Sequence, residues 1–219
     1  DRSSVKKLLE LIGVRMKGPI SAIANASITF TATANTLTSV TINPASSVVS
    51  VTSPEDGGSL TYTIYKVKSN GTVDLEDYSN SLEFTYSAVL LGDTVTITDA
   101  VLMEGALAVE GGTFASVDAV KTVKLSQSPY VEKSAQVFVN GILATAGIYT
   151  EEDNIYFASG ATDKVFQVTT DEAFRASILF GDNSVGQSPA VGDEYTVSYR
   201  VGGGTRGNIA KSFINAQIA

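Results

Sequence analysis

The chain has 219 residues and an acidic balance, with 15 basic against 23 acidic side chains and a formal net charge of −8. It contains no histidine and no cysteine, which excludes imidazole zinc sites, Ser-His-Asp triads, Cys-His dyads and disulfide bonds within this stretch. The basic residues are dispersed, which disfavours a nucleic-acid surface. Charged residues make up 17%, against about 25% in ordinary soluble domains, so we expect a surface of small polar residues or one covered by partners.

The length allows one large β domain or two smaller ones, each with its own apolar core. No apolar run approaches the roughly 18 residues that cross a membrane, so we expect no membrane span. The first residues, Asp1 and Arg2, do not begin a signal peptide, and we expect the chain to be part of a longer protein.

A short amphipathic helix is predicted near the N-terminus, over residues 4–12. Val5, Leu8, Leu9 and Ile12 fall at the spacing of one helical face, and Gly13 would end the helix. Most such helices cover a core, so we expect packing on a β domain; the alternative is a helix that binds a partner.

From Ser27 onward the pattern changes to short β-branched and aromatic runs at intervals of about 10 residues, the spacing of a sandwich or barrel. The expected breaks between these runs are Asn43-Pro44, residues 54–58, residues 69–72 and Gly92-Asp93. The expected strands are marked by Ile28 and Phe30, Val40 and Ile42, residues 48–51, Leu60 to Ile64, Leu82 to Tyr86, and Val95 with Ile97.

The stretch 100–113 fits either a strand or a helix, and its Gly111-Gly112 step favours a strand and a domain junction. We therefore predict an N-terminal helix and linker over residues 1–24, a β domain over 25–112 that carries an insertion peculiar to this chain, and a second β domain over 113–219. In the last of these, Asn140-Gly141 between apolar runs predicts a hairpin, and Val165 with Val168 predicts one more strand.

The most patterned stretch begins with a short apolar strand over residues 178–180, followed by a loop in which glycine and proline supply the turns. Residues 194–201 then alternate with a period of two. Tyr195, Val197, Tyr199 and Val201 are predicted to face the core. The opposite face, with Glu194, Thr196, Ser198 and Arg200, is predicted to face water.

Gly202, Gly204 and Gly207 satisfy the spacing of the dinucleotide-binding fingerprint. That fingerprint also needs an acidic residue about 20 positions later, and no acidic residue follows Glu194. The alternative, which we favour, is that these glycines allow another backbone to approach closely.

Calcium is the other ligand considered, at residues 151–153 and at Asp182, Asn183 and Asp193. A calcium loop places oxygen ligands at alternating positions around a sharp turn, a pattern absent from both sets, so solvated turns are favoured. We expect no metal, no cofactor and no catalytic residue in this chain.

The order of motifs from Ile178 to Ile209, with Phe180-Gly181-Asp182, Tyr199-Arg200 and a triple glycine, resembles the closing signature of baseplate J-like and baseplate wedge proteins of contractile-tailed phages. The resemblance extends in order of motifs over residues 103–210. Asn183 departs from it, because glycine is commoner there.

The resemblance implies a structural subunit of the tail baseplate that is not an enzyme. Its partners would be further copies of itself and other wedge and hub proteins, arranged around the central hub and rearranged when the tail contracts. Its location would be the virion, after assembly in the cytoplasm of the host bacterium, with no nucleic-acid or small-molecule partner. The candidate interface residues are Arg200, Gly202, Gly203, Gly204, Arg206, Gly207 and Asn208.

The predicted fold class is mainly β within an α+β description, with short antiparallel strands in one or two sandwich-like domains and the N-terminal helix. A second functional class fits the same composition, namely a carbohydrate- or receptor-binding β-sandwich module. An enzyme that uses a carboxylate pair is a third, for which the sequence shows no recognisable spacing.

Overall fold

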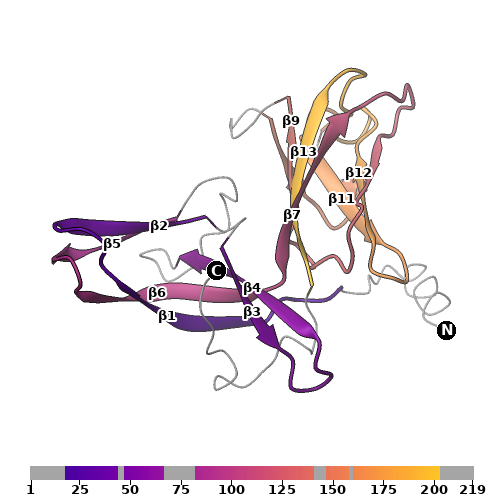
Figure 1. Ribbon diagram of the computed structural model, residues 1–219. Coiled ribbons are helices and arrows are strands. Elements are labelled where there is room, and N and C mark those ends of the chain that lie inside the picture. Colours follow the sequence, from indigo (N-terminus) through magenta and orange to yellow (C-terminus); the bar gives the residue numbers. More distant parts are fainter. Residues whose placement is uncertain (1–17, 44–46, 67–81, 141–146, 158–159, 203–219) are drawn as a thin grey trace. The chain divides into compact units, whose positions relative to one another are not determined.

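The computed structural model describes residues 18–43, 47–66, 82–140, 147–157 and 160–202 (Figure 1). Across these residues the chain forms strands and a single-turn 3-10 helix, η1 (Ile155–Phe157), and the expected mainly β character is confirmed. The helix predicted over residues 4–12 lies outside the described residues, as does the turn at 69–72.

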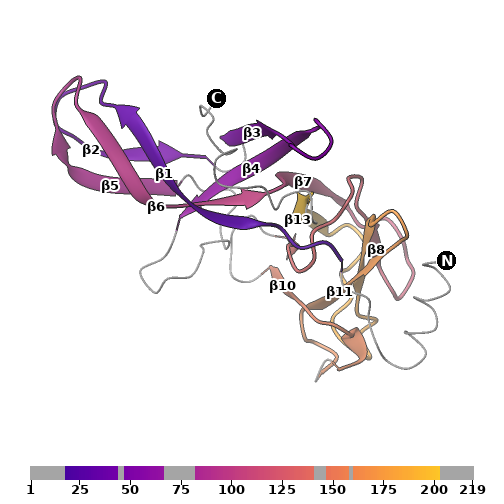
Figure 2. The same ribbon diagram turned by 90° about the horizontal axis from the view of Figure 1, so that it is seen from below.

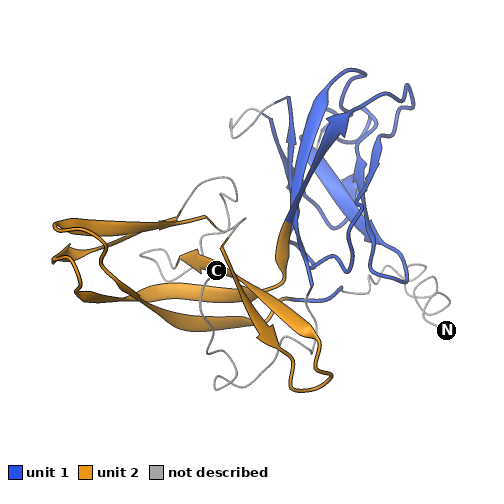
Figure 3. Cartoon of the chain, viewed as in Figure 1, with its two compact units in different colours: residues 1–20, 108–202 blue, residues 21–107, 203–219 orange. Residues whose placement is uncertain are grey.

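The chain divides into two compact units, shown in Figure 3. Unit 1 comprises residues 1–20 and 108–202, and unit 2 comprises residues 21–107 and 203–219. The chain passes from unit 2 to unit 1 between Leu107 and Ala108, inside the strand β7 (Ala106–Thr113). Gly111 and Gly112 lie within this strand, as the sequence of residues 100–113 predicted.

Unit 2 contains two antiparallel sheets, and Figures 1 and 2 both show the smaller one alongside β1 and β6. The larger sheet has the order β1-β6-β4-β3, and the smaller pairs β2 with β5. The strands are β1 (Ile23–Thr31), β2 (Leu37–Ile42), β3 (Val48–Thr52), β4 (Ser59–Lys66), β5 (Leu82–Val89) and β6 (Thr94–Glu104).

Apolar side chains from both sheets of unit 2 meet in one buried cluster. Tyr62 and Ile64 come from β4, Phe84 from β5 and Ile97 from β6, and each follows the period-two alternation of its strand. Burial of each such side chain contributes about 1.5–3 kcal/mol to the free energy of folding. The alternation therefore fixes the register, because a slip by one residue would expose this set.

The break predicted at residues 54–58 is the turn between β3 and β4. Ser53 N–H donates to Gly58 O at 2.7 Å, and Gly57 has a φ of +69°, which glycine adopts without steric cost. The predicted Gly92-Asp93 turn lies between β5 and β6, where Gly92 has a φ of +91°. Both turn predictions are confirmed.

Unit 1 contains one seven-stranded sheet with the order β7-β13-β9-β10-β11-β12-β8. The strands β10 and β11 pair in parallel, whereas antiparallel pairs were predicted. The chain between them contains η1, and such a connection can return in the same direction. The remaining strands are β8 (Thr122–Lys124), β9 (Gln136–Val139), β10 (Ile148–Glu151), β11 (Val165–Thr170), β12 (Ala176–Phe180) and β13 (Glu194–Val201).

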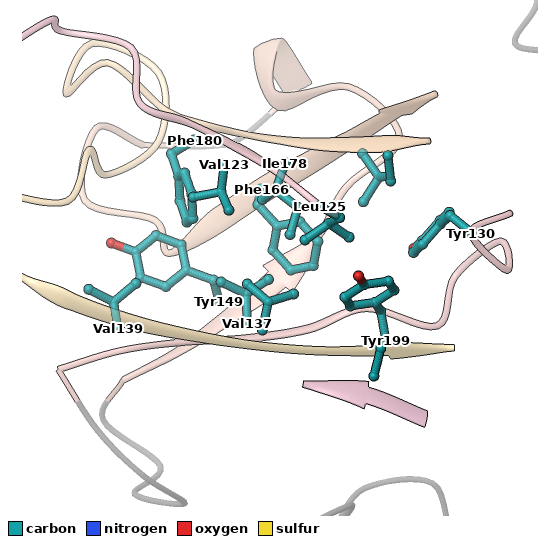
Figure 4. Close-up of a cluster of buried hydrophobic side chains, with 14 of the residues drawn as sticks. Val123, Leu125, Tyr130, Val137, Val139, Tyr149, Phe166, Ile178, Phe180 and Tyr199 are labelled. Atoms are coloured by element: carbon teal, nitrogen blue, oxygen red, sulfur yellow. The ribbon is translucent and has the colours of Figure 1, made fainter. Parts of the chain in front are cut away.

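The core of unit 1 is a single cluster to which every strand of this sheet contributes, part of which Figure 4 shows. One sheet can surround one core only by curling, so β7 and β8 are the two edges of a curled sheet. Aromatic rings fill the interior. Phe180 makes edge-on contacts with Phe114 and Tyr149, with centroids 5.3 Å apart in each pair, a favoured geometry.

The strand β13 has the predicted boundaries, and Val197 and Tyr199 are buried in the core as predicted. The prediction for its other face is wrong at two positions, because Ser198 is 2% exposed and Arg200 is 3% exposed. Alternation shows which residues share a face, but a strand inside a curled sheet can be covered on both faces. Ser198 Oγ lies 3.4 Å from Gln136 Oε1 on β9, which gives this buried hydroxyl a polar partner.

Candidate functional site

The candidate site follows from the sequence analysis and lies where β13 ends. Of its proposed residues the structure describes Arg200 and Gly202. The remaining candidates lie outside the described residues; they are Gly203, Gly204, Arg206, Gly207 and Asn208.

The backbone at this strand end is hydrogen-bonded to the segment that leads into β9. Gly202 N–H donates to Pro129 O at 2.9 Å, and Val131 N–H donates to Arg200 O at 3.0 Å. Arg200 N–H donates to Ser134 Oγ at 3.1 Å. The close backbone approach expected near the glycines is thus made at Gly202 by this chain itself.

Glycine is required at position 202, because its φ of +129° is a conformation that residues with a side chain rarely adopt. Arg200, by contrast, is held by burial, with 3% of its surface exposed. A buried guanidinium is stable only when it is paired and hydrogen-bonded. In the isolated chain the Arg200 side chain is therefore covered by the fold of unit 1.

The Phe180-Gly181-Asp182 motif forms a tight turn after β12. A Cβ on Gly181 would lie 2.3 Å from the carbonyl oxygen of Gly186, so this position excludes any side chain. Asp182 Oδ1 accepts hydrogen bonds from the N–H groups of Ser184 at 2.8 Å and Val185 at 2.9 Å. These bonds hold the pKa of Asp182 below its ordinary value.

Asn183, in the same turn, has a φ of +67°. Asparagine is the residue other than glycine that best tolerates this conformation. Its side-chain oxygen also accepts the N–H of Ser188 at 2.8 Å, which extends the turn toward the next loop. Asparagine at this position therefore permits a backbone geometry that glycine would also allow.

The acidic groups considered for calcium are used within the fold. Lys133 Nζ lies 2.7 Å from Asp153 Oδ1 and 3.5 Å from Glu151 Oε1. Partial burial lowers the pKa of Lys133, but these two carboxylates outweigh it and raise that pKa overall. Across the described part of the chain, no group of three or more acidic, histidine or cysteine residues is placed to hold a metal ion.

A polar network that the sequence analysis missed lies between the two edges of the curled sheet. Glu110 comes from the edge strand β7, and Ser126 follows the other edge strand, β8. The Ser126 N–H donates to Glu110 Oε1 at 3.0 Å and to Oε2 at 3.1 Å, and its hydroxyl donates to Oε1 at 2.7 Å. The Tyr199 hydroxyl donates to the same carboxylate and accepts the N–H of Gln127 at 3.1 Å.

The electrostatics of this network follow from its contacts. Partial burial raises the pKa of Glu110, but the hydrogen bonds from Tyr199, Ser126 and Gln127 outweigh it and lower that pKa overall. Burial, followed by the bond to Glu110, raises the pKa of Tyr199 to about 12. The pair therefore consists of a carboxylate and a neutral phenol at neutral pH. It joins the neighbouring strands β7 and β13, while the bonds from Ser126 to Glu110 link the two sheet edges.

No protein-family model matches the chain, and a search of curated proteins finds no significant match. Within the described residues, no helix is long and apolar enough to cross a membrane.

Proposed function

We propose that the chain is a structural subunit of a contractile-tail baseplate, which acts by assembling with copies of itself and with other wedge and hub proteins. The observation that carries this proposal is the order of motifs from Ile178 through the triple glycine, which resembles the closing signature of that family.

The roles of the signature residues are compatible with a structural protein. Phe180 fills the core, Gly181 permits a close turn, Tyr199 joins the edge network and Gly202 holds a strand end. These residues are used to maintain the shape of unit 1. Residues with such roles suit a protein whose function depends on a fixed shape.

The arrangement of the sheets within each unit is part of the same proposal. We describe unit 2 as sandwich-like, because two sheets share one core, and unit 1 as a curled sheet closed by the Glu110 network. Each unit would move as a body when the tail contracts, with changes confined to the contacts between proteins. The location would be the virion, after assembly in the bacterial cytoplasm.

The test is to find the chain in assembled tails. Contractile tails purified from the phage or bacterium that encodes the chain are analysed by mass spectrometry, and an antibody against the chain labels them for electron microscopy. The proposal requires labelling at the baseplate end. Labelling of another part of the particle, or absence of the chain from intact tails, would refute it.

A second candidate, a carbohydrate-binding module, has one observation in its favour. Tyr156 in η1 is 72% exposed, and exposed aromatic rings provide flat apolar surfaces for ligands. A glycan array with the full chain separates the two candidates. A specific glycan whose binding is abolished by Tyr156→Ala would favour this second function, whereas the baseplate proposal predicts no specific binding.

A further inference from the structure

The turn between β5 and β6 is fixed by backbone and side-chain hydrogen bonds. Leu90 N–H donates to Asp93 Oδ2 at 2.9 Å, and Asp93 N–H donates back to Leu90 O at 3.1 Å. Gly92, with a φ of +91°, donates to Ala32 O at 2.9 Å, and Ala32 N–H donates to Asp93 O at 2.8 Å. The turn is thus attached to the end of β1.

The turn that precedes β13 in unit 1 has the same construction. Ala190 N–H donates to Asp193 Oδ2 at 2.8 Å, and Asp193 N–H donates to Ala190 O at 3.2 Å. Gly192 has a φ of +92° and donates to Phe114 O at 2.9 Å, and Phe114 N–H donates to Asp193 O at 2.9 Å. Each unit therefore uses one Gly-Asp turn attached to the end of a neighbouring strand.

This repeat provides an internal control for the residues that the turn requires. The turn in unit 1 is built with Ala190 where the turn in unit 2 has Leu90. Its geometry therefore does not require leucine at this position. Yet Leu90 is 63% exposed and the adjacent Leu91 is 62% exposed. Two neighbouring leucines remain in water at a turn that could be built without the first of them.

Hydrogen bonds also fix the backbone of the leucine pair. Asn35 Oδ1, in the loop between β1 and β2, accepts the N–H of Leu91 at 2.9 Å. Thr36 N–H donates to Val89 O at 2.9 Å, which joins that loop to the end of β5. A surface ordered before it binds loses little conformational entropy on binding, so its apolar contacts translate efficiently into affinity.

We propose that Leu90 and Leu91, together with the loop at residues 32–36, form a docking tip that inserts into an apolar pocket of a different protein. Between residues 31 and 42 and between residues 84 and 98, Asp93 is the one charged residue. The matching pocket is therefore apolar and uncharged at its base. This docking tip does not depend on the baseplate assignment.

A membrane and a second copy of the chain fit the tip less well. The tip carries no lysine or arginine, and the chain has a net charge of −8, so anionic lipid would repel it. A symmetric contact between two tips would bury far less than the roughly 800 Å² per partner of a stable interface. Two leucines in a pocket, in contrast, match the small apolar centre that dominates many interfaces.

The experiment places the photo-crosslinking residue p-benzoylphenylalanine at position 91 of the full chain, in extract of the cells that naturally produce it. The crosslinked peptide is sequenced, and the protein it comes from is purified for affinity measurement. We expect one peptide from a different protein. The double variant Leu90→Ser, Leu91→Ser should bind that protein at least about thirtyfold more weakly.

The matched control is Val191→Ser, because Val191 is 56% exposed next to the equivalent glycine of the unit 1 turn. This variant should bind with unchanged affinity, and both variants should melt as the unchanged chain does, since the altered side chains are exposed. Crosslinks to a second copy, crosslinks to phosphatidylglycerol vesicles, no crosslink, or equal affinity of the leucine variant would each overturn the proposal.

Discussion

The bond between Tyr199 and Glu110 gives the sharpest test of the polar network around Glu110. Tyr199→Phe keeps the aromatic ring, which is fully buried in the core, and removes only the hydroxyl. That hydroxyl donates to a carboxylate and accepts the Gln127 N–H. A hydrogen bond to a charged group contributes about 1.5–3 kcal/mol, so we expect a loss of about 2 kcal/mol in the free energy of unfolding.

The partner substitution is Glu110→Gln, which retains the shape of the side chain and removes its charge. In a double-mutant cycle the two changes should be less than additive, with a coupling of about 1 kcal/mol or more, because both remove the same bond. Hydrogen exchange of the Ser126 and Gln127 amides reports on unit 1 directly, which matters because two units need not unfold in one transition. Additive effects would refute the inference that Tyr199 and Glu110 stabilise unit 1 through a shared bond.

The same pair predicts that the stability of unit 1 depends on pH in the acidic range. Burial raises the pKa of Glu110, but its hydrogen bonds bring the folded-state pKa below the ordinary 4.5. A depressed folded-state pKa contributes stability above the ordinary pKa, and that stability is lost as the pH falls through the folded-state pKa. The difference in unfolding free energy between the unchanged chain and Glu110→Gln should therefore shrink between about pH 7 and about pH 3. A constant difference over that range would contradict the assignment.

Two further predictions concern positions inside the fold. Gly181→Ala should lower the free energy of unfolding by more than about 3 kcal/mol, because its Cβ would lie 2.3 Å from backbone atoms of Gly186. Gly57→Ala should lower it by about 1 kcal/mol, since its φ is +69° but nothing lies within 4 Å of the added Cβ. Equal losses in urea melts would contradict the close approach at Gly181. Arg200→Ala should lower the free energy of unfolding by about 2 kcal/mol or more, because Arg200 is buried. Arg175 is exposed, so Arg175→Ala should change that free energy by less than about 0.5 kcal/mol. Equal melting temperatures of these two arginine variants would show that Arg200 contributes nothing by its burial.

The sequence predicted the parts of the fold that depend on local chemistry. The boundaries of β13 and its core-facing Val197 and Tyr199 follow from strict alternation, and the turns at Gly57 and Gly92 follow from residues that tolerate positive φ. These features are fixed by neighbours in the chain. A single sequence contains that information.

The remaining features depend on pairing between distant residues. The stretch 100–113 was ambiguous because its alanine, leucine and glutamate also suit a helix. It becomes β6 and β7 because β6 pairs with both β1 and β4, and Gly105, with a φ of +104°, separates the two strands. The Glu110–Ser126 contact is likewise invisible in the sequence, since it exists only when the sheet curls. The sequence shows both Gly-Asp pairs, but only the matching hydrogen bonds show that the two turns are built in the same way.

The contacts of Arg200 and Gly202 bear on where the proposed assembly interface can lie. Both residues are bound to their own chain through the Pro129–Ser134 stretch, which pairs the N–H and C=O groups of Arg200 and the N–H group of Gly202. Replacing Arg200, which is also buried, would therefore act through the folding of unit 1. The Leu90–Leu91 tip has the opposite character, because its leucines are exposed and its turn forms without leucine in unit 1. Loss of partner binding without loss of stability is thus expected from changes at the tip, and loss of stability is expected from changes at Arg200.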